Sequence, residues 1–241
     1  RPLFENGKHL GKVYRFRNVG LIQCPNGDLL AFVEARFAVS DHSEKDVLMR
    51  RSTDRGITWG PYDEVWGYLE ADDAGWKDPA PVLDATTGRL FYLNVDTGEP
   101  SWGVVYVAGS GFSSPTWGVT SAPLVDDDLL IAIVGGEPDA LVVAFDKRTG
   151  EERWRALDVV AEAGYGQPVI YEAGGARQLI VWHPTGLTSL DPLTGKVYWE
   201  QEFDTADGMT ISTPVRSDRY LIITQLYNGA LMMRLGVDSP T

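Results

Sequence analysis

The chain has 241 residues, and its 26 glycines, 14 prolines and 8 tryptophans indicate many turns and large aromatic packing units. A formal net charge of -13 argues against a nucleic-acid partner, because Lys and Arg must neutralise the phosphates in such binding. The single cysteine, Cys24, excludes an intrachain disulfide. No apolar run approaches the roughly 20 residues of a membrane helix. We therefore expect a soluble protein without a membrane partner. The sequence does not identify its cellular compartment.

The chain begins with Arg1, and no basic-then-apolar leader follows it. We expect no signal peptide in this stretch, and a chain trimmed or processed from a longer one.

Strand, turn and strand follow one another in repeated units along the chain. The first unit spans residues 18–36 and contains PNGD, a strong tight-turn signal. The other four units begin at prolines spaced by 42, 45 and 46 residues, which is the size of one propeller blade. These units are APVLDATTGRLFYLNV (80–95), APLVDDDLLIAIVGG (122–136), QPVIYEAGGARQLIVWH (167–183) and TPVRSDRYLIITQLY (213–227).

Three units continue into a further hairpin that ends on tryptophan. These hairpins are DTGEPSW (96–102), DKRTGEERW (146–154) and DPLTGKVYW (191–199). No segment has the 3.6-residue period of an amphipathic helix. The pattern predicts an all-β fold, a single β-propeller over residues 1–241 with five four-stranded blades. A β-sandwich with accidental spacing is the alternative.

The ends of the chain suggest how the ring closes. The last unit ends in YNGALMMRLGV (227–237) without a tryptophan strand behind it, and GKVYRF (11–16) repeats most of GKVYWE (195–200). Because unpaired edges pair with other chains, we expect the N-terminal strand to complete the last blade. The chain is then a monomer, or an oligomer in which two copies exchange strands.

The first part of the chain resembles the sialidases. RSTDRGITW (51–59) matches their Asp-box, S-x-D-x-G-x-T-W, and YRFRNVGLIQCPNGDLLAFVEAR (14–36) resembles the opening of an exo-sialidase. Residues 1–95 thus look like its first blades. The Asp accepts hydrogen bonds from its own turn, the Gly takes positive φ, and the Trp packs between sheets. The matching positions are Ser52, Asp54, Gly56, Thr58 and Trp59.

Residues 96–241 instead resemble the repeats of pyrroloquinoline-quinone-type propellers, A-x-D-x-x-T-G-x-x-x-W. We place the seam between residues 95 and 96. A recombined or engineered chimera is our leading hypothesis, and a natural hybrid is the alternative. The repeat positions are Asp146, Thr149, Gly150, Trp154, Asp191, Thr194, Gly195 and Trp199.

The sialidase resemblance implies a site for an acidic sugar. Sialidases bind the substrate carboxylate with three arginines and use an Asp as acid/base and a Tyr nucleophile. The resemblance places Arg17, Arg36 and Asp78 in substrate binding and Asp41 as the acid/base. Guanidinium groups bind carboxylates in a bidentate manner, which suits such a ligand. The other arginines and the Tyr/Glu pair come from later blades, which this chain has replaced.

The quinone resemblance implies a vicinal cysteine pair and a calcium site. The chain has one cysteine, and the acidic run VDDDLL (125–130) lacks the ligand spacing of a calcium loop. We therefore expect neither a cofactor nor a metal. Because losing part of a catalytic unit removes nearly all of its rate enhancement, we expect a non-catalytic propeller scaffold. Two alternatives are a sialic-acid-binding or weakly hydrolytic exo-sialidase remnant and a protein-binding scaffold.

Overall fold

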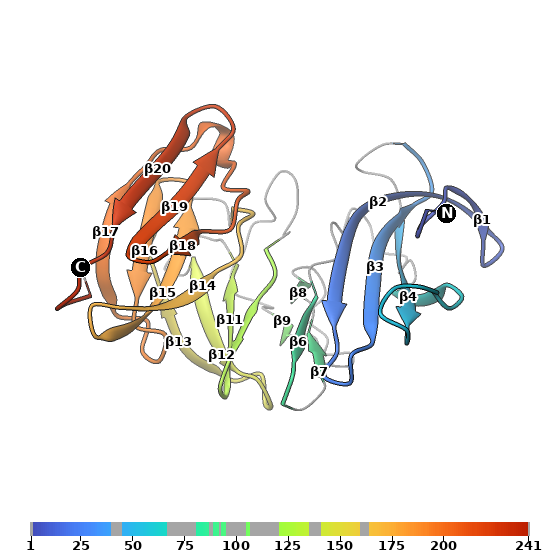
Figure 1. The fold of residues 1–241 in the computed structure, drawn as a ribbon, viewed down its shortest axis with the longest axis horizontal. Helices are drawn as coiled ribbons and strands as arrows, with labels where there is room; N and C mark the ends of the chain where they lie inside the picture. Colours follow the sequence, from blue (N-terminus) through green and yellow to red (C-terminus); the bar gives the residue numbers. More distant parts are fainter. Residues whose placement is uncertain are drawn as a thin grey trace. The chain divides into compact units, whose positions relative to one another are not determined.

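The computed structural model describes residues 2–39, 45–66, 81–86, 89–91, 93–94, 105–106, 121–134, 141–159 and 164–240. The chain divides into two compact units, Arg1–Tyr92 and Leu93–Thr241 (Figure 1). Within the described residues, no helix is long and apolar enough to cross a membrane. The class is all-β, as the sequence predicts.

The first unit is built on one five-stranded antiparallel sheet in the order β1-β2-β3-β4-β5. A short hairpin of β6 and β7 follows it. The strands are β1 (Gly7–His9), β2 (Lys12–Gln23), β3 (Leu29–Arg36), β4 (Lys45–Ser52), β5 (Asp63–Trp66), β6 (Val82–Asp84) and β7 (Arg89–Phe91).

The core of this sheet is aromatic. Tyr14 and Leu48 are fully buried and pack with Val33 and Ala35, and further aromatic side chains surround them. Phe16 and Tyr62 stack with ring centroids 5.6 Å apart. The opposite face of the sheet carries the buried Phe32 and Val47 together with the charged Glu34, because neighbouring residues of a strand point to opposite faces.

The strand that contains most of GKVYRF is part of the first sheet. In the described residues β2, which contains most of GKVYRF, pairs with β1 and β3, and β20 pairs only with β19. The reason is local. Leu10 and Gly11 both have positive φ, at 49° and 82°, and form a two-residue turn that lets β2 pair with the strand just before it. Such a short loop costs little entropy to close.

The second unit contains two complete four-stranded antiparallel sheets and a third sheet of three strands. Their orders are β10-β11-β12-β13, β14-β15-β16-β17 and β18-β19-β20. A short parallel pair, β8 (Leu93–Asn94) and β9 (Val105–Tyr106), precedes them. The strands are β10 (Leu124–Asp126), β11 (Leu129–Ile133), β12 (Val142–Asp146), β13 (Glu152–Ala156), β14 (Val169–Ala173), β15 (Ala176–His183), β16 (Gly186–Leu190), β17 (Val197–Glu202), β18 (Val215–Ser217), β19 (Tyr220–Gln225) and β20 (Gly229–Arg234).

The middle sheet of this unit has apolar side chains on both faces. Leu179 and Val181 of β15 pack in one core with Ile131 of β11, whereas Ile180 and Trp182 pack in another core with Leu221 of β19. Because neighbouring residues of a strand point to opposite faces, one strand supplies both cores. The three sheets are therefore stacked face to face, as blades are.

These sheets match the expected units. The hairpins DKRTGEERW and DPLTGKVYW form the β12–β13 and β16–β17 connections, and the last sheet lacks a fourth strand in the described residues. The first sheet has five strands instead of four, because the β1 hairpin is added to it. The hairpin DTGEPSW lies outside the described residues, and the total of five blades and the closure of the ring stay predictions.

Candidate functional site

The Asp-box forms a closed turn around the Asp54 carboxylate. The hydroxyl of Ser52 donates to Asp54 Oδ1 at 2.7 Å, and the backbone N–H of Thr58 donates to the same oxygen at 2.8 Å. The Thr58 hydroxyl donates to Asp54 Oδ2, and Gly56 takes a φ of 89°. Trp59 donates its ring N–H to the Gly56 carbonyl at 3.1 Å. Every Asp-box position thus contributes to the geometry of one turn.

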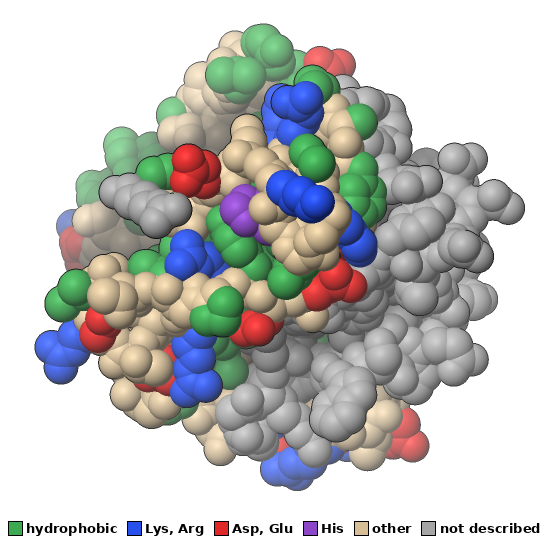
Figure 2. All heavy atoms as spheres, turned by 90° about the vertical axis from the view of Figure 1, so that its right-hand side faces the viewer, with side chains coloured by type: hydrophobic (Ala, Val, Ile, Leu, Met, Phe, Trp, Pro, Cys, Tyr) green, Lys and Arg blue, Asp and Glu red, His purple; other side chains and the backbone are tan. Residues whose placement is uncertain are grey.

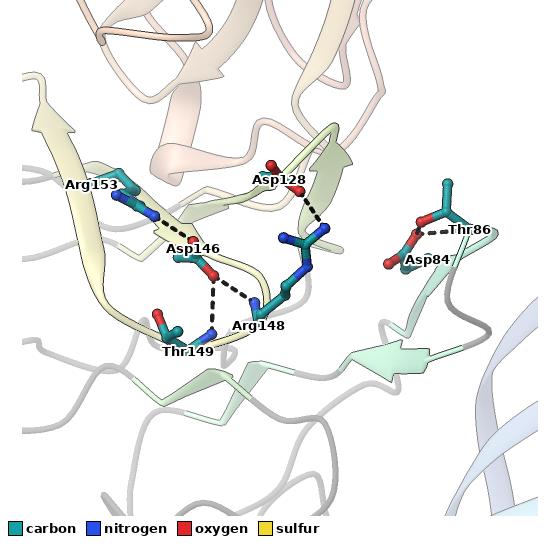
Figure 3. Close-up of polar contacts among 7 residues, drawn as sticks. All are labelled: Asp84, Thr86, Asp128, Asp146, Arg148, Thr149 and Arg153. Atoms are coloured by element: carbon teal, nitrogen blue, oxygen red, sulfur yellow. Dashed lines mark hydrogen bonds and ion pairs between the residues drawn. The ribbon is translucent and has the colours of Figure 1, made fainter.

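In the hairpin DKRTGEERW, the aspartate accepts hydrogen bonds from residues nearer to it in sequence than in the Asp-box. Asp146 Oδ1 accepts the backbone N–H groups of Arg148 and Thr149 at 2.8 and 3.0 Å, and Arg153 pairs with Oδ2 at 2.5 Å (Figure 3). Gly150 has a φ of 76° and donates to the Asp146 carbonyl. The turn is therefore closed by contacts two and three residues ahead, whereas the Asp-box reaches four residues ahead.

The next repeat has the same turn. Asp191 Oδ1 accepts the backbone N–H groups of Leu193 and Thr194 at 2.8 and 3.2 Å. Tyr198, where the earlier repeat has Arg153, donates to Asp191 Oδ2 at 3.0 Å. Asp84 begins a turn of this type in the first unit, where its Oδ1 accepts the N–H and hydroxyl of Thr86 (Figure 3).

The repeat tryptophans connect neighbouring sheets. The Trp154 ring lies against Gly195, where an added Cβ would be 2.6 Å from Cε3, and its N–H donates to the Pro192 carbonyl at 3.2 Å. Trp199 donates to Gln178 Oε1 within its own sheet at 2.8 Å. One turn thus receives the tryptophan of the sheet before it, which links β13 to the β16–β17 connection.

These turns hold their carboxylates in the ionised form. The hydrogen bond from the Thr58 hydroxyl, followed by backbone donors, lowers the pKa of Asp54 to about 2. The Arg153 guanidinium, with the backbone N–H groups of the turn, holds the pKa of Asp146 well below its usual range. A general acid needs a carboxyl group that is protonated near the working pH, so neither residue is suited to that role.

A basic face on β2, β3 and β4 is the strongest candidate for ligand binding. Register places Arg17 opposite Glu34, Arg15 opposite Arg36, and Arg36 opposite Lys45, and directly opposed residues share a face of the sheet. Four cationic side chains and one carboxylate therefore lie on the same face of the sheet. We call Arg15, Arg17, Glu34, Arg36 and Lys45 the basic face.

The inner part of the basic face is buried and ion-paired. Glu34 receives Arg36 at 2.7 Å and Lys45 at 2.7 Å, and the side chains of all three are almost fully buried. Asn18 donates to the same carboxylate at 3.1 Å. Arg17 differs, because it is exposed and makes no hydrogen bond or ion pair with any residue that the structure describes. Arg15 is the other exposed member of the basic face.

A second buried pair lies on the aromatic face of the same strands. Tyr14 donates its hydroxyl to Asp46 at 2.5 Å, and Lys12 pairs with Asp46 at 2.9 Å. Burial, reinforced by the Asp46 carboxylate, raises the pKa of Tyr14 above its usual range. A tyrosine that holds its proton this firmly is a poor nucleophile, so this group serves to order β2 against β4.

Two residues implied by the sialidase resemblance, Asp41 and Asp78, lie outside the described residues. The structure brings Arg17 and Arg36 onto the same face, with Arg36 bound to Glu34. Glu34 and Lys45 are members of this face that the sequence interpretation did not include. Glu34 lies two residues before Arg36 on β3, and Lys45 is the first residue of β4, opposite Arg36.

No group of three or more metal-binding side chains occurs in the described part of the chain. His183 is buried, its ring nitrogens contact Thr188 and Thr185, and burial lowers its pKa to about 4. It is a neutral structural histidine. In the view of Figure 2, basic and acidic side chains are interspersed over the coloured residues.

Comparison with known proteins gives two different matches. A family model described as outer membrane protein assembly factor BamB matches residues 77–237. A sialidase from Micromonospora viridifaciens is 37% identical over 82 residues, which cover 33% of this chain and 13% of that protein. The two matches agree with the two resemblances seen in the sequence.

A search of solved structures matches a BamB protein and a sialidase. BamB from Moraxella catarrhalis is 13% identical with a TM-score of 0.33, covering 95% of this chain and 52% of that one. The Hadza microbial sialidase Hz136 is 13% identical with a TM-score of 0.41, covering 93% of this chain and 45% of that one. The chain spans about half the length of these solved relatives and 13% of the sialidase.

Proposed function

The chain belongs to the family of the outer membrane protein assembly factor BamB, and from this premise we propose that it is a non-catalytic propeller-type scaffold. One observation carries the proposal. The aspartates of the repeated motifs, Asp54, Asp146 and Asp191, are each occupied by hydrogen bonds within their own turn. A carboxylate used in this way holds a hairpin and is not available to a substrate.

The origin of the chain is part of this proposal. The family model begins at residue 77, and a sialidase matches 82 residues of the same chain. We propose that the chain was recombined, by nature or by engineering, from these two propeller families. Neither parent then contributes a complete set of catalytic groups.

Incubation with a sialylated trisaccharide tests the scaffold proposal. We expect no release of sialic acid by the intact chain, with a known sialidase as the positive control. Release that scales with the concentration of this protein and disappears in Arg17→Ala would refute a non-catalytic scaffold.

The basic face supports a second function, binding of an acidic sugar. Arg17 is exposed without a partner in the described residues, and Arg36 and Lys45 place two more cations behind it. A guanidinium forms strong charge-assisted hydrogen bonds with a carboxylate. Binding needs only these cations, whereas hydrolysis needs an acid/base and a nucleophile as well.

Calorimetric titration with sialic acid tests this second function. We expect weak saturable binding that Arg17→Ala abolishes and that Arg219→Ala, which removes an exposed arginine of the second unit, leaves unchanged. Equal binding by both variants would mean that the basic face is not the site. No binding at millimolar ligand would mean that Glu34 already neutralises the face.

A further inference from the structure

A hollow lies between two turns of the second unit. Its volume is about 760 Å³, which is within the range of small-molecule sites, and all of its lining residues belong to this unit. The β14–β15 turn and the β18–β19 turn form two of its sides. The third side is the segment Leu235–Val237, which follows β20. Three segments that are distant in sequence therefore meet at this hollow.

The β14–β15 turn contributes backbone donors to the hollow. Gly174 and Gly175 have φ values of 60° and 72° and form the two-residue turn between the paired residues Ala173 and Ala176. Neither glycine N–H has a hydrogen-bond partner among the described residues. The Ser239 carbonyl lies so close to Gly174 that a Cβ there would overlap it. Successive N–H groups in a turn form concave sites for anions, so this turn can donate to an acidic ligand.

Two arginines add charged donors on the opposite side. Arg216 donates from Nε to the Asp218 carbonyl at 2.5 Å and from Nη1 to the Glu172 carbonyl. These bonds orient the guanidinium without neutralising it, because both acceptors are uncharged, and they leave Nη2 able to donate. Arg219 also lines the hollow, is exposed, and has no side-chain partner in the part of the chain that the structure describes.

The local balance of charge favours an anion. The whole chain has 34 acidic and 21 basic residues, whereas this lining has three arginines and two carboxylates. The third arginine, Arg177, pairs with Asp126 at 2.5 Å, and this bond, with the nearby Asp127 and Glu172, raises the pKa of Arg177 above its usual range. Arg177 is thus already matched with carboxylates. The two remaining guanidinium groups face a single carboxylate of the lining, that of Asp218.

The number of donors and the size of the hollow indicate the class of ligand. A phosphate monoester carries nearly two negative charges and three acceptor oxygens, which suit two guanidinium groups and a pair of backbone N–H groups. A single carboxylate gains less, because Asp218 repels every anion and only one charge is available to offset this. A bare phosphate is much smaller than the hollow. Leu235 and Val237 give the remaining space an apolar lining for an organic group.

We propose that this hollow binds a small organic phosphate monoester, with its phosphoryl group held by Arg216, Arg219 and the N–H groups of the β14–β15 turn. The organic part would lie against Leu235 and Val237. The inference goes beyond the scaffold proposal and does not rest on it, because binding of this kind requires no catalytic group.

Calorimetric titration of the intact chain with phenyl phosphate tests the site. We expect saturable binding. Inorganic phosphate should bind about tenfold more weakly, because it lacks the organic group that covers the apolar lining. Benzoate has the same ring with one negative charge, and it should also bind about tenfold more weakly.

Four single variants locate the site. Arg219→Ala removes a guanidinium that has no other partner in the described residues, so affinity for phenyl phosphate should fall by about tenfold. Arg216→Lys keeps the charge but loses the planar fork, and it should weaken binding by a similar factor. Arg234→Ala is the matched control, because it removes an exposed arginine of β20 outside the lining. Arg17→Ala should also have no effect, just as Arg219→Ala should leave sialic acid binding unchanged.

Thermal unfolding of each variant shows whether its fold is retained. If Arg216→Lys is unstable, Arg219→Ala carries the test alone, because its side chain makes no contact that the fold needs in the described residues.

Several results would overturn the inference. Absence of saturable phenyl phosphate binding at millimolar concentration would mean that the hollow is not a phosphate site. Equal affinity of Arg219→Ala and Arg234→Ala would place the binding elsewhere, and its loss in Arg17→Ala would assign it to the basic face. Benzoate that binds as tightly as phenyl phosphate would exclude selection of a phosphoryl group. Inorganic phosphate that binds as tightly would exclude a role for the organic part. None of these results involves sialic acid release, so failure here is distinct from failure of the scaffold proposal.

Discussion

The contact between Trp154 and Gly195 gives the sharpest test of how the sheets are held together. In Gly195→Ala the new Cβ would lie 2.6 Å from Cε3 and 3.0 Å from Cδ2 of Trp154. The ring cannot move aside easily, because it is 9% exposed and donates to the Pro192 carbonyl. Gly195 also has a φ of 70°, which an alanine adopts at a cost of about 1–2 kcal/mol. Overpacking adds about 1–3 kcal/mol, so the free energy of unfolding should fall by about 2–5 kcal/mol.

The matched control is Gly150→Ala in the preceding hairpin. Gly150 has a φ of 76°, and an added Cβ would meet nothing within 4 Å. This variant should lose only the conformational cost of about 1–2 kcal/mol. The effect of either substitution on the unfolded chain is the same, so it cancels in the comparison. Urea unfolding followed by tryptophan fluorescence measures both variants. If they are destabilised equally, the packing of Trp154 on Gly195 does not contribute to stability.

Three further predictions concern ionisable groups. Burial lowers the pKa of His183 to about 4, so between about pH 6.5 and 4 the unfolded chain binds a proton that the folded chain does not. About 3 kcal/mol of the free energy of unfolding should be lost as the pH falls through this range. Urea unfolding at several pH values should show this dependence, and the same dependence in His183→Gln would contradict it. The pKa of Asp54 is lowered to about 2, so its stabilising contribution is complete above about pH 4 and is lost as the pH falls through 2. In Asp54→Asn the free energy of unfolding should change less with pH between these values. An unchanged pH dependence would argue against the turn contacts. Glu34→Gln removes the carboxylate that pairs with both Arg36 and Lys45, and should lower the free energy of unfolding by about 3–5 kcal/mol. A second change, Lys45→Met, should restore part of this loss in thermal unfolding. An unchanged stability of Glu34→Gln would show that this buried pairing does not stabilise the fold.

The turns of the chain could be predicted from its sequence, because the contacts that form them join residues close in sequence. Asp146 and Gly150 lie in one hairpin, and the side-chain and backbone contacts that they make reach only a few residues. The same holds for Ser52, Asp54 and Thr58. The all-β class and the positions of β12–β13 and β16–β17 follow from these signals, since each hairpin begins and ends at a residue with a specific conformational role.

The pairing of β2 could not be read in this way. The turn between His9 and Lys12 contains Leu10 at a φ of 49°, a conformation that leucine seldom takes and that gives no recognisable turn signal. The short hairpin that pairs β1 with β2 was therefore not predicted, and closure of the ring by the N-terminal strand stays a prediction.

The burial and pairing of the charged residues on the basic face could not be predicted from the sequence pattern either. Glu34 and Lys45 are among the least exposed residues of the first sheet, although charged side chains are rarely buried unless they are paired. The pairing depends on the β3–β4 register, which places Arg36 opposite Lys45 and so brings three charges together. Only the folded arrangement of the strands reveals that Arg36 already has a carboxylate partner.

The most direct test of the non-catalytic scaffold is turnover of a fluorogenic sialoside at high protein concentration, measured for the intact chain, Arg17→Ala and Met232→Thr. Met232→Thr serves as the matched control, because it leaves the basic face unchanged. The account predicts that all three progress curves follow the buffer, because the turn carboxylates are occupied and Arg36 is bound to Glu34. Turnover by the intact chain and Met232→Thr that Arg17→Ala abolishes would contradict it and identify a working sialidase site.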